Sequence, residues 1–152
     1  MRIGNLEVYR IEGNSMFPAY KEGELILVLN SKNIHPPYES VVIVRRREGK
    51  SGKVFKRVIA IPNDIVRIES KKVFVNDKLT VQENFIGNPT HSDASQKAWK
   101  LEDNEYFVIG DNLSQSTDSR DFGPITFDEI ISKVILKIWS KKISRYFRNI
   151  FR

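Results

Sequence analysis

The chain has 152 residues, of which 40% are hydrophobic and 29% are charged, and its formal net charge is +6 at pH 7. This length suits one domain with its own core, and the absence of cysteine excludes a thiol nucleophile, a cysteine-based metal site and a disulfide framework. The positive charge favours an anionic partner, either nucleic acid or an acidic lipid surface. No apolar run approaches the ~20 residues of a membrane-spanning helix, so we expect no spanning anchor in this chain.

Short apolar runs between turn residues dominate the chain. Their length, their β-branched content and their glycine, asparagine or aspartate boundaries are typical of strands. In chain order they occupy residues 7–13, 23–30, 40–61, 64–81, 105–112 and 132–139. RREGKSGK at residues 46–53 and VND at residues 75–77 predict hairpin connections, and residues 86–99 predict a long surface loop. We therefore expect a mainly β fold.

The end of the chain has a different character, so we divide it into a domain over residues 1–139 and a tail over residues 140–152. Five lysine and arginine residues of the tail separate apolar residues at helical spacing, namely Ile143, Phe147, Ile150 and Phe151. A short basic amphipathic helix of this kind lies on anionic membrane surfaces. The alternative is a helix that docks on its own domain with a solvated basic face. A nucleic-acid arm is disfavoured because the chain shows no recognised binding motif.

The stretch GNSMFP presents Ser15 in a turn between glycine and proline. A serine in a turn usually satisfies local backbone groups, and it becomes a nucleophile only with a base beside it. The two histidines, His35 and His91, lie in expected loops, where solvated positions are favoured over a catalytic role.

Lys56, in the apolar stretch KVFKRVIAIPND, is the main remaining candidate for the base. An ordinary lysine, with a pKa near ~10.4, is protonated at neutral pH. We expect burial by Val54, Phe55 and Val58 to lower the pKa of Lys56 and so to favour the neutral amine. Arg57 is expected on the opposite face of the strand. The alternative is that Lys56 is a solvent-facing edge residue that blunts strand pairing.

The stretch GDNLSQSTDSRDFGPI, residues 110–125, is too polar for a core strand and too rich in charged residues for a passive turn. Asp118 and Arg120 are spaced to form an ion pair, and Ser114, Ser116 and Ser119 could extend it into a network. The alternatives are a calcium-binding loop or an ordinary surface loop. The stretch lacks the ligand order of an EF-hand, and we see no ligand set for a metal.

These three segments, in this order, resemble the type I signal peptidases, the serine-lysine proteases that remove leader sequences. GNSMFP matches the serine box, FKRVIAIPND the lysine box and GDNLSQSTDSRDFG the distal box, and the resemblance extends over most of residues 8–139. It implies coiled antiparallel β-sheets, a substrate bound in extended form, and cleavage of preprotein leader peptides after small residues. It implies no cofactor and no nucleic-acid partner.

Matched position by position, the resemblance also implies the site residues. Ser15 is the nucleophile, Lys56 is the general base and Ser116 orients the lysine amine. Asp118 and Arg120 form a supporting pair. These five assignments are expectations carried over from the family.

The substrate pocket implied by the resemblance includes Met16, and we add Phe55 to it. Three positions depart from the usual family pattern: Ala19 stands where threonine is common, Asn63 replaces a glycine, and Gly13 stands where some members place a second serine. Because Gly13 has no hydroxyl, we expect the oxyanion hole to depend mainly on backbone N–H groups, including that of Ser15.

Several functions remain open on the sequence alone. Alternatives are an autoprotease related to the SOS repressors, a specialised protease that trims the leader of one enzyme precursor, and an inactive β module that binds peptides or lipid. Because we expect no spanning helix, we predict peripheral association with a membrane through the tail. A cytoplasmic location follows if the protein is a maturation protease.

Overall fold

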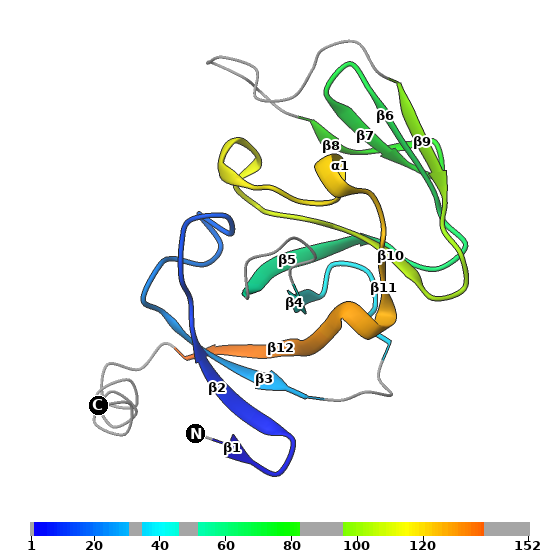
Figure 1. Ribbon diagram of the computed structural model, residues 1–152. Helices are drawn as coiled ribbons and strands as arrows, with labels where there is room; N and C mark the ends of the chain where they lie inside the picture. Colours follow the sequence, from blue (N-terminus) through cyan, green and yellow to red (C-terminus); the bar gives the residue numbers. More distant parts are fainter. Residues whose placement is uncertain (1, 31–34, 46–51, 83–95, 139–152) are drawn as a thin grey trace.

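The computed structural model describes residues 2–30, 35–45, 52–82 and 96–138, which form two antiparallel sheets (Figure 1). The first sheet has eight strands, in the spatial order β1 (Arg2–Ile3), β2 (Leu6–Arg10), β3 (Leu25–Leu29), β12 (Ile130–Ile138), β4 (Val41–Arg45), β5 (Lys53–Ala60), β10 (Glu105–Ile109) and β11 (Ile125–Thr126). The second has four strands, in the order β8 (Lys78–Gln82), β7 (Lys72–Val75), β6 (Ile65–Glu69) and β9 (Lys97–Lys100). The predicted mainly β fold is confirmed.

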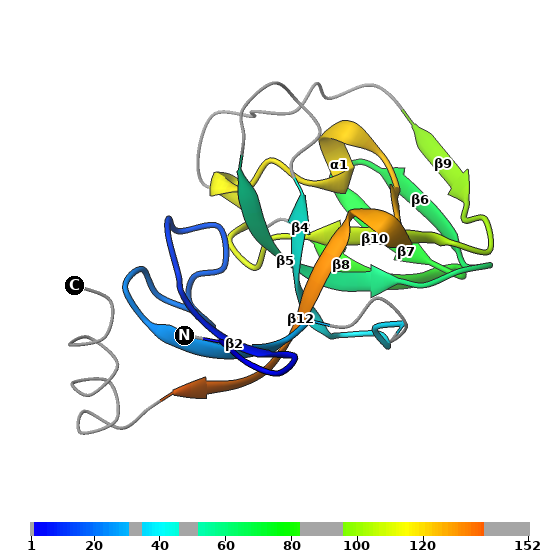
Figure 2. The same ribbon diagram turned by 60° about the horizontal axis from the view of Figure 1, so that its bottom comes forward.

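The helical elements of the described residues are short and lie between β10 and β12. They are η1 (Leu113–Gln115), α1 (Ser119–Phe122) and η2 (Phe127–Glu129). Figures 1 and 2 show the small sheet at one end of the molecule and the strands β2 and β3 at the other, with β4, β5 and β10 between them. The predicted C-terminal helix lies outside the described residues.

Three clusters of buried side chains fill the core. One lies between the small sheet and β5 and β10, and includes Val66 and Phe107. The second lies under β3 and includes Ile26 and Phe55. The third, which includes Val58, packs on the opposite face of β4 and β5 from the second. Strands β4 and β5 are therefore covered on both sides, which explains their nearly continuous apolar sequence.

Both predicted hairpins are present in the pairing. Strands β4 and β5 pair in register from Val41↔Arg57 to Arg45↔Lys53, although residues 46–51 of the connection lie outside the described part. Strands β7 and β8 are joined through Asn76 and Asp77, with φ of 50° and 62°. Two successive left-handed residues are the signature of the tight hairpin turn that the sequence indicated.

One loop prediction needs correction. Residues 97–99 were expected in the long surface loop, but they form most of β9, because Trp99 pairs with Val66 and packs on the first core cluster. His35 is an exposed residue outside helices and strands, as predicted; its ring stacks on Phe127 with centroids 4.2 Å apart, and its Nδ1 lies 2.6 Å from the Tyr106 hydroxyl. His35 is thus held by aromatic neighbours, while the position of His91 lies outside the described residues.

Candidate active site

Ser15 lies in a loop whose two ends are joined by backbone hydrogen bonds. The Ile11 N–H donates to the Glu24 carbonyl and the Gly23 N–H donates to the Ile11 carbonyl, both at 2.8 Å. Gly13 has a φ of 77°, a left-handed conformation that glycine adopts without steric cost. The glycine before the serine therefore serves to bend the chain just before Ser15.

A buried side chain and two backbone bonds fix the turn that contains Ser15. The Phe17 N–H donates to the Asn14 carbonyl at 3.1 Å, and the Tyr20 N–H donates to the Met16 carbonyl at 2.8 Å. Met16 is only 1% exposed and belongs to the second core cluster. Because Met16 is anchored in the core, Ser15 beside it stays at the surface of that core, partly accessible.

Strand β5 buries Lys56 almost completely. The side chain is 2% exposed, and alternation along the strand places it on the same face as Val54 and Val58, which belong to the third core cluster. Phe55 lies on the other face, in the second cluster. The expectation that Lys56 is buried is confirmed, but Phe55 does not take part in that burial.

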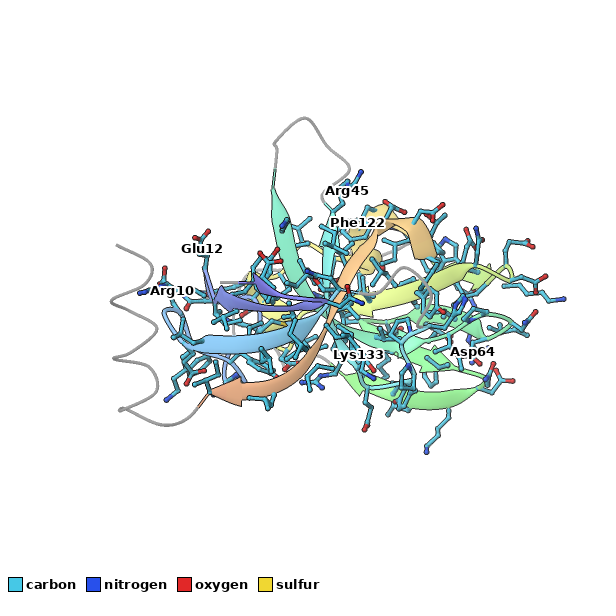
Figure 3. The ribbon with its side chains drawn as sticks, turned by 90° about the horizontal axis from the view of Figure 1, so that it is seen from below. Arg10, Glu12, Arg45, Asp64, Phe122 and Lys133 are labelled. Atoms are coloured by element: carbon cyan, nitrogen blue, oxygen red, sulfur yellow. The ribbon has the colours of Figure 1, made fainter. Side chains whose placement is uncertain are left out.

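Ser15 and Lys56 line the same cavity, which has a volume of about 570 Å³. Its apolar wall comes from β4, β5, α1 and β11, and its polar rim from residues between β10 and β12 and from the end of β4. The other lining residues are Val44, Arg45, Val54, Thr117, Asp121, Phe122, Ile125 and Glu129. Figure 3 shows Arg45 and Phe122 close together at this edge of the molecule.

Neither Met16 nor Phe55 lines this cavity. Both belong to the second core cluster and are 1% and 7% exposed. They thus lie on the side of β5 away from Val54. Their predicted role in the substrate pocket stays a prediction.

The carboxylates of the cavity fix the short helices of its wall. Asp121 accepts a hydrogen bond from the Asp118 N–H at 2.9 Å, closing the capping box of α1. Glu129 accepts from the N–H and the hydroxyl of Thr126, at 2.7 Å and 3.1 Å. Within the described ranges, no three histidine, aspartate or glutamate side chains are grouped to hold a metal ion.

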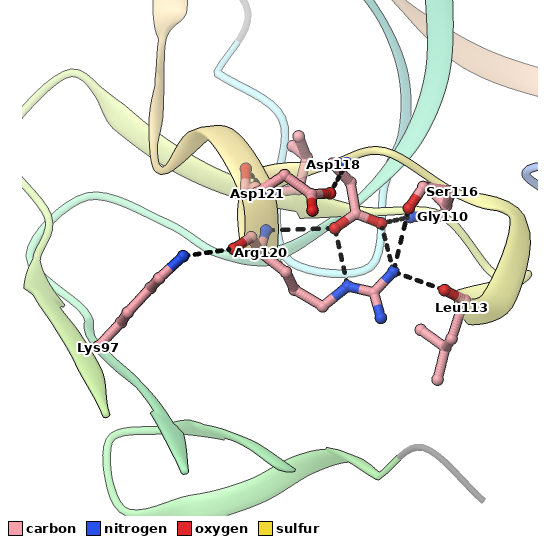
Figure 4. A network of polar contacts seen from close by, with 9 residues as sticks. Lys97, Gly110, Leu113, Ser116, Asp118, Arg120 and Asp121 are labelled. Atoms are coloured by element: carbon pink, nitrogen blue, oxygen red, sulfur yellow. Dashed lines mark hydrogen bonds and ion pairs between the residues drawn. The ribbon is translucent and has the colours of Figure 1, made fainter. Parts of the chain in front are cut away.

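Asp118 is the centre of the polar network in the distal segment (Figure 4). It is fully buried and accepts from the Gly110 N–H at 3.0 Å and from Arg120 Nε at 2.9 Å. Arg120 Nη2 also donates to Asp118 and to the Leu113 carbonyl, at 3.0 Å and 2.8 Å. The predicted pair of Asp118 and Arg120 is confirmed. It joins β10, η1 and α1 through charge-assisted bonds, which are the stronger class.

Gly110 brings Ser15 and Ser116 into close proximity. A Cβ at Gly110 would lie 2.5 Å from the Ser15 carbonyl oxygen and 2.3 Å from Ser116 Oγ, so only glycine fits between them. The Ser116 hydroxyl is buried and has no hydrogen-bond partner among the described residues. A buried hydroxyl without a partner costs about 1–3 kcal/mol. Gly110 was recognised only as the first residue of the distal stretch, and no role was predicted for it.

An ion pair next to Lys56 was not foreseen from the sequence. Arg57 donates from Nε and Nη2 to the two carboxylate oxygens of Asp111, at 2.8 Å and 2.7 Å, and from Nη1 to the Glu39 carbonyl. The hydrogen bonds to Asp111 raise the pKa of Arg57. Arg57 is thereby held away from the face of β5 that carries Lys56. No pattern near Arg57 predicts this contact, because Asp111 lies 54 residues further along the chain.

The comparisons with known proteins agree with one another. The model of the family described as signal peptidase, peptidase S26, matches residues 1–139. Signal peptidase IB of Staphylococcus aureus is 30% identical, over 86% of this chain and 76% of the relative. Signal peptidase I V of Bacillus subtilis is 31% identical, over 83% of this chain and 82% of the relative.

A solved structure shares the fold. The crystal structure of a signal peptidase I from Enterococcus faecalis matches with a TM-score of 0.50 and 18% identity, over 68% of this chain and 98% of that one. At this identity the likeness concerns the fold alone. None of the described helices is long and apolar enough to span a membrane.

Proposed function

The chain belongs to the signal peptidase family, peptidase S26, and we propose that Ser15 and Lys56 form the catalytic dyad of a serine endopeptidase that removes leader peptides. The observation that carries the proposal is that both residues line one cavity while Lys56 is 2% exposed. Burial in an apolar setting favours the neutral form of an amine. A neutral amine beside a serine is what general-base activation requires.

The proposed reaction begins when the Lys56 amine takes the proton of the Ser15 hydroxyl. The serine oxygen attacks the carbonyl carbon of the scissile peptide bond, and the resulting oxyanion is stabilised by backbone N–H groups, including that of Ser15. The lysine ammonium then gives its proton to the leaving amine, and the C–N bond breaks. Water, deprotonated by Lys56, attacks the acyl carbon; the ester C–O bond breaks, and the lysine ammonium returns its proton to the Ser15 oxygen.

Ser116 is proposed to orient the Lys56 amine. Its hydroxyl is buried and lacks a partner among the described residues, and it packs on Gly110 opposite the Ser15 carbonyl. The buried pair of Asp118 and Arg120 supports this arrangement, because Arg120 also donates to the Ser116 carbonyl at 3.4 Å. The support is structural, since neither charged group of the pair lines the cavity.

The proposed substrate is the leader peptide of a preprotein, cut after a small side chain. We propose that Met16 and Phe55, on the other face of β5, bound the shallow apolar pocket that takes this side chain once the peptide lies along the strand. An extended peptide meets alternate pockets on a strand surface.

We also propose that residues 140–152 hold the protein on anionic membranes without spanning them. The proposal is based on the apolar stripe of this segment and on its five basic residues. Apolar side chains that enter the interface and cations that meet acidic head groups give reversible binding.

The test of the proposed activity is incubation with leader peptides that contain an Ala-x-Ala cleavage site, with the products identified by mass spectrometry. Wild type should cut after the second alanine, and Ser15→Ala should abolish the cut. Thr80→Ala is a matched control, because it removes a hydroxyl from the distant small sheet. Cleavage by Ser15→Ala at the rate of the control would refute the assignment.

A further inference from the structure

Asn112 binds the loop that contains Ser15 through its backbone and its side chain. Its N–H donates to the Ser15 carbonyl at 2.9 Å, and its Nδ2 donates to the Asn14 carbonyl at 3.1 Å. The side-chain contact joins residues 98 positions apart in the chain. Two consecutive carbonyls of the serine turn are thus held by one residue of the distal segment.

The side chain of Asn112 is itself oriented by the short helix η1. Its Oδ1 accepts from the Ser114 hydroxyl at 3.0 Å, and this bond sets the orientation of the amide; the second Nδ2 hydrogen donates to Gln115 Oε1 at the longer distance of 3.3 Å and is not needed for that orientation. The amide therefore uses its oxygen and directs its nitrogen toward Asn14. An asparagine suits this position because the contact needs a donor toward Asn14 and an acceptor toward η1 at the same time.

The same turn is also tied to the strand that carries Lys56. Ile109, three residues before Asn112, pairs with Arg57 in the ladder of β10 and β5, and Asp111 binds the Arg57 guanidinium. The path from Arg57 to Ser15 therefore passes only through paired backbone and short hydrogen bonds. The position of Ser15 relative to β5 depends on this path.

We propose that Asn112 is a positioning residue that fixes the Ser15 turn relative to Lys56. The inference rests on the proposed function of these two residues. The Asn14 carbonyl also accepts from the Phe17 N–H, so the turn still closes when the Asn112 side chain is removed. The contact that is lost is the side-chain hydrogen bond between the turn and the segment after β10. We therefore expect the geometry of the dyad to change while the fold is kept.

The test compares Asn112→Ala and Asn112→Asp with Gln115→Ala, which removes the other acceptor of the same amide. Loss of one positioning bond should lower kcat about tenfold in Asn112→Ala. Asn112→Asp should fall further, because a carboxylate oxygen would face the Asn14 carbonyl. In both variants KM and the midpoint of the pH–rate profile should stay at their wild-type values, and the melting temperature should fall by only a few degrees, as expected for the loss of exposed hydrogen bonds. Gln115→Ala should keep wild-type kinetics.

Amide hydrogen exchange, followed residue by residue by NMR, gives a readout that does not depend on activity. In Asn112→Ala the amide protons of Phe17 and of position 112 should exchange faster, while those of the β4–β5 ladder should not change. Wild-type kcat together with wild-type exchange would overturn the proposal, and so would an equal loss of kcat in Gln115→Ala. If wild type cuts no leader peptide, the proposed function fails, and the exchange at these two positions alone decides whether Asn112 holds the turn.

Discussion

Gly110→Ala puts a methyl group where the structure leaves no room for one. The new Cβ would lie 2.3 Å from Ser116 Oγ, 2.6 Å from Ser116 Cβ and 2.5 Å from the Ser15 carbonyl oxygen. Ordinary contacts between such atoms need roughly 3.5 Å. Gly110 does not have a left-handed φ, so alanine is compatible with its backbone. The effect of the substitution is therefore steric.

The magnitude follows from the displacement that the methyl group demands. Ser15 contributes a backbone atom, which cannot rotate away, so the serine turn must move by about 1 Å. Overpacking of this kind costs about 1–3 kcal/mol of unfolding free energy, which corresponds to a fall in melting temperature of about 3–10 °C. A displacement of the nucleophile by that distance should lower kcat on the order of 100-fold.

The assay measures kcat on a leader peptide and the melting temperature of the same preparation. Gly23→Ala is the matched control, because Gly23 lies in the Ser15 loop with a φ of 82° and open space around its Cβ position. It should lose stability through backbone strain but keep kcat. If Gly110→Ala keeps kcat within about twofold of wild type at an unchanged melting temperature, the close packing of Ser15, Gly110 and Ser116 is not the geometry of the working enzyme.

Three further predictions concern Lys56 and the tail. Lys56→Met should abolish cleavage without lowering the melting temperature, because methionine fills the buried site without a charge. Lys53→Met, on the exposed part of the same strand, is the control and should cleave normally. Turnover by Lys56→Met would exclude Lys56 as the base. The rate should rise with pH through the neutral to alkaline range as Lys56 loses its proton, with little effect of salt and none of EDTA; a maximum in acid, or loss of activity on chelation, would contradict the mechanism. Wild type should co-sediment with acidic liposomes at low salt and a chain that ends at Trp139 should not; equal sedimentation of the two would indicate that the tail packs on its own domain.

The strands could be predicted from the sequence because their signals are local. Short β-branched runs and turn residues suffice to indicate β4 and β5, for example. The order of strands in the sheet could not be predicted in this way. Strand β12 lies between β3 and β4 because Val134 pairs with Val28 and Ser132 with Ile43, and no local pattern specifies pairings over such separations. The family resemblance implied coiled antiparallel sheets but gave no strand order.

The site shows the same division between near and distant contacts. Asp118 and Arg120 are two residues apart, so their pairing was predictable from spacing and charge. Asp111 and Arg57 are 54 residues apart, and no local pattern distinguishes Asp111 among the 19 acidic residues of the chain. Strand alternation alone puts Phe55 on the face opposite Lys56, so Phe55 could have been left out of the residues expected to bury the lysine.

The two ion pairs near the site bear on the proposal that Lys56 is the base. A cation close to a lysine would lower the pKa of that lysine through repulsion. Arg57 and Arg120, however, each bind an aspartate through two guanidinium nitrogens, so the charge of each guanidinium is largely balanced by its own carboxylate. Burial on the face of β5 that carries Val54 and Val58 favours the neutral form of an amine. Because burial, unlike exposed charge, is not screened by salt, the proposed base should work over a wide range of ionic strength.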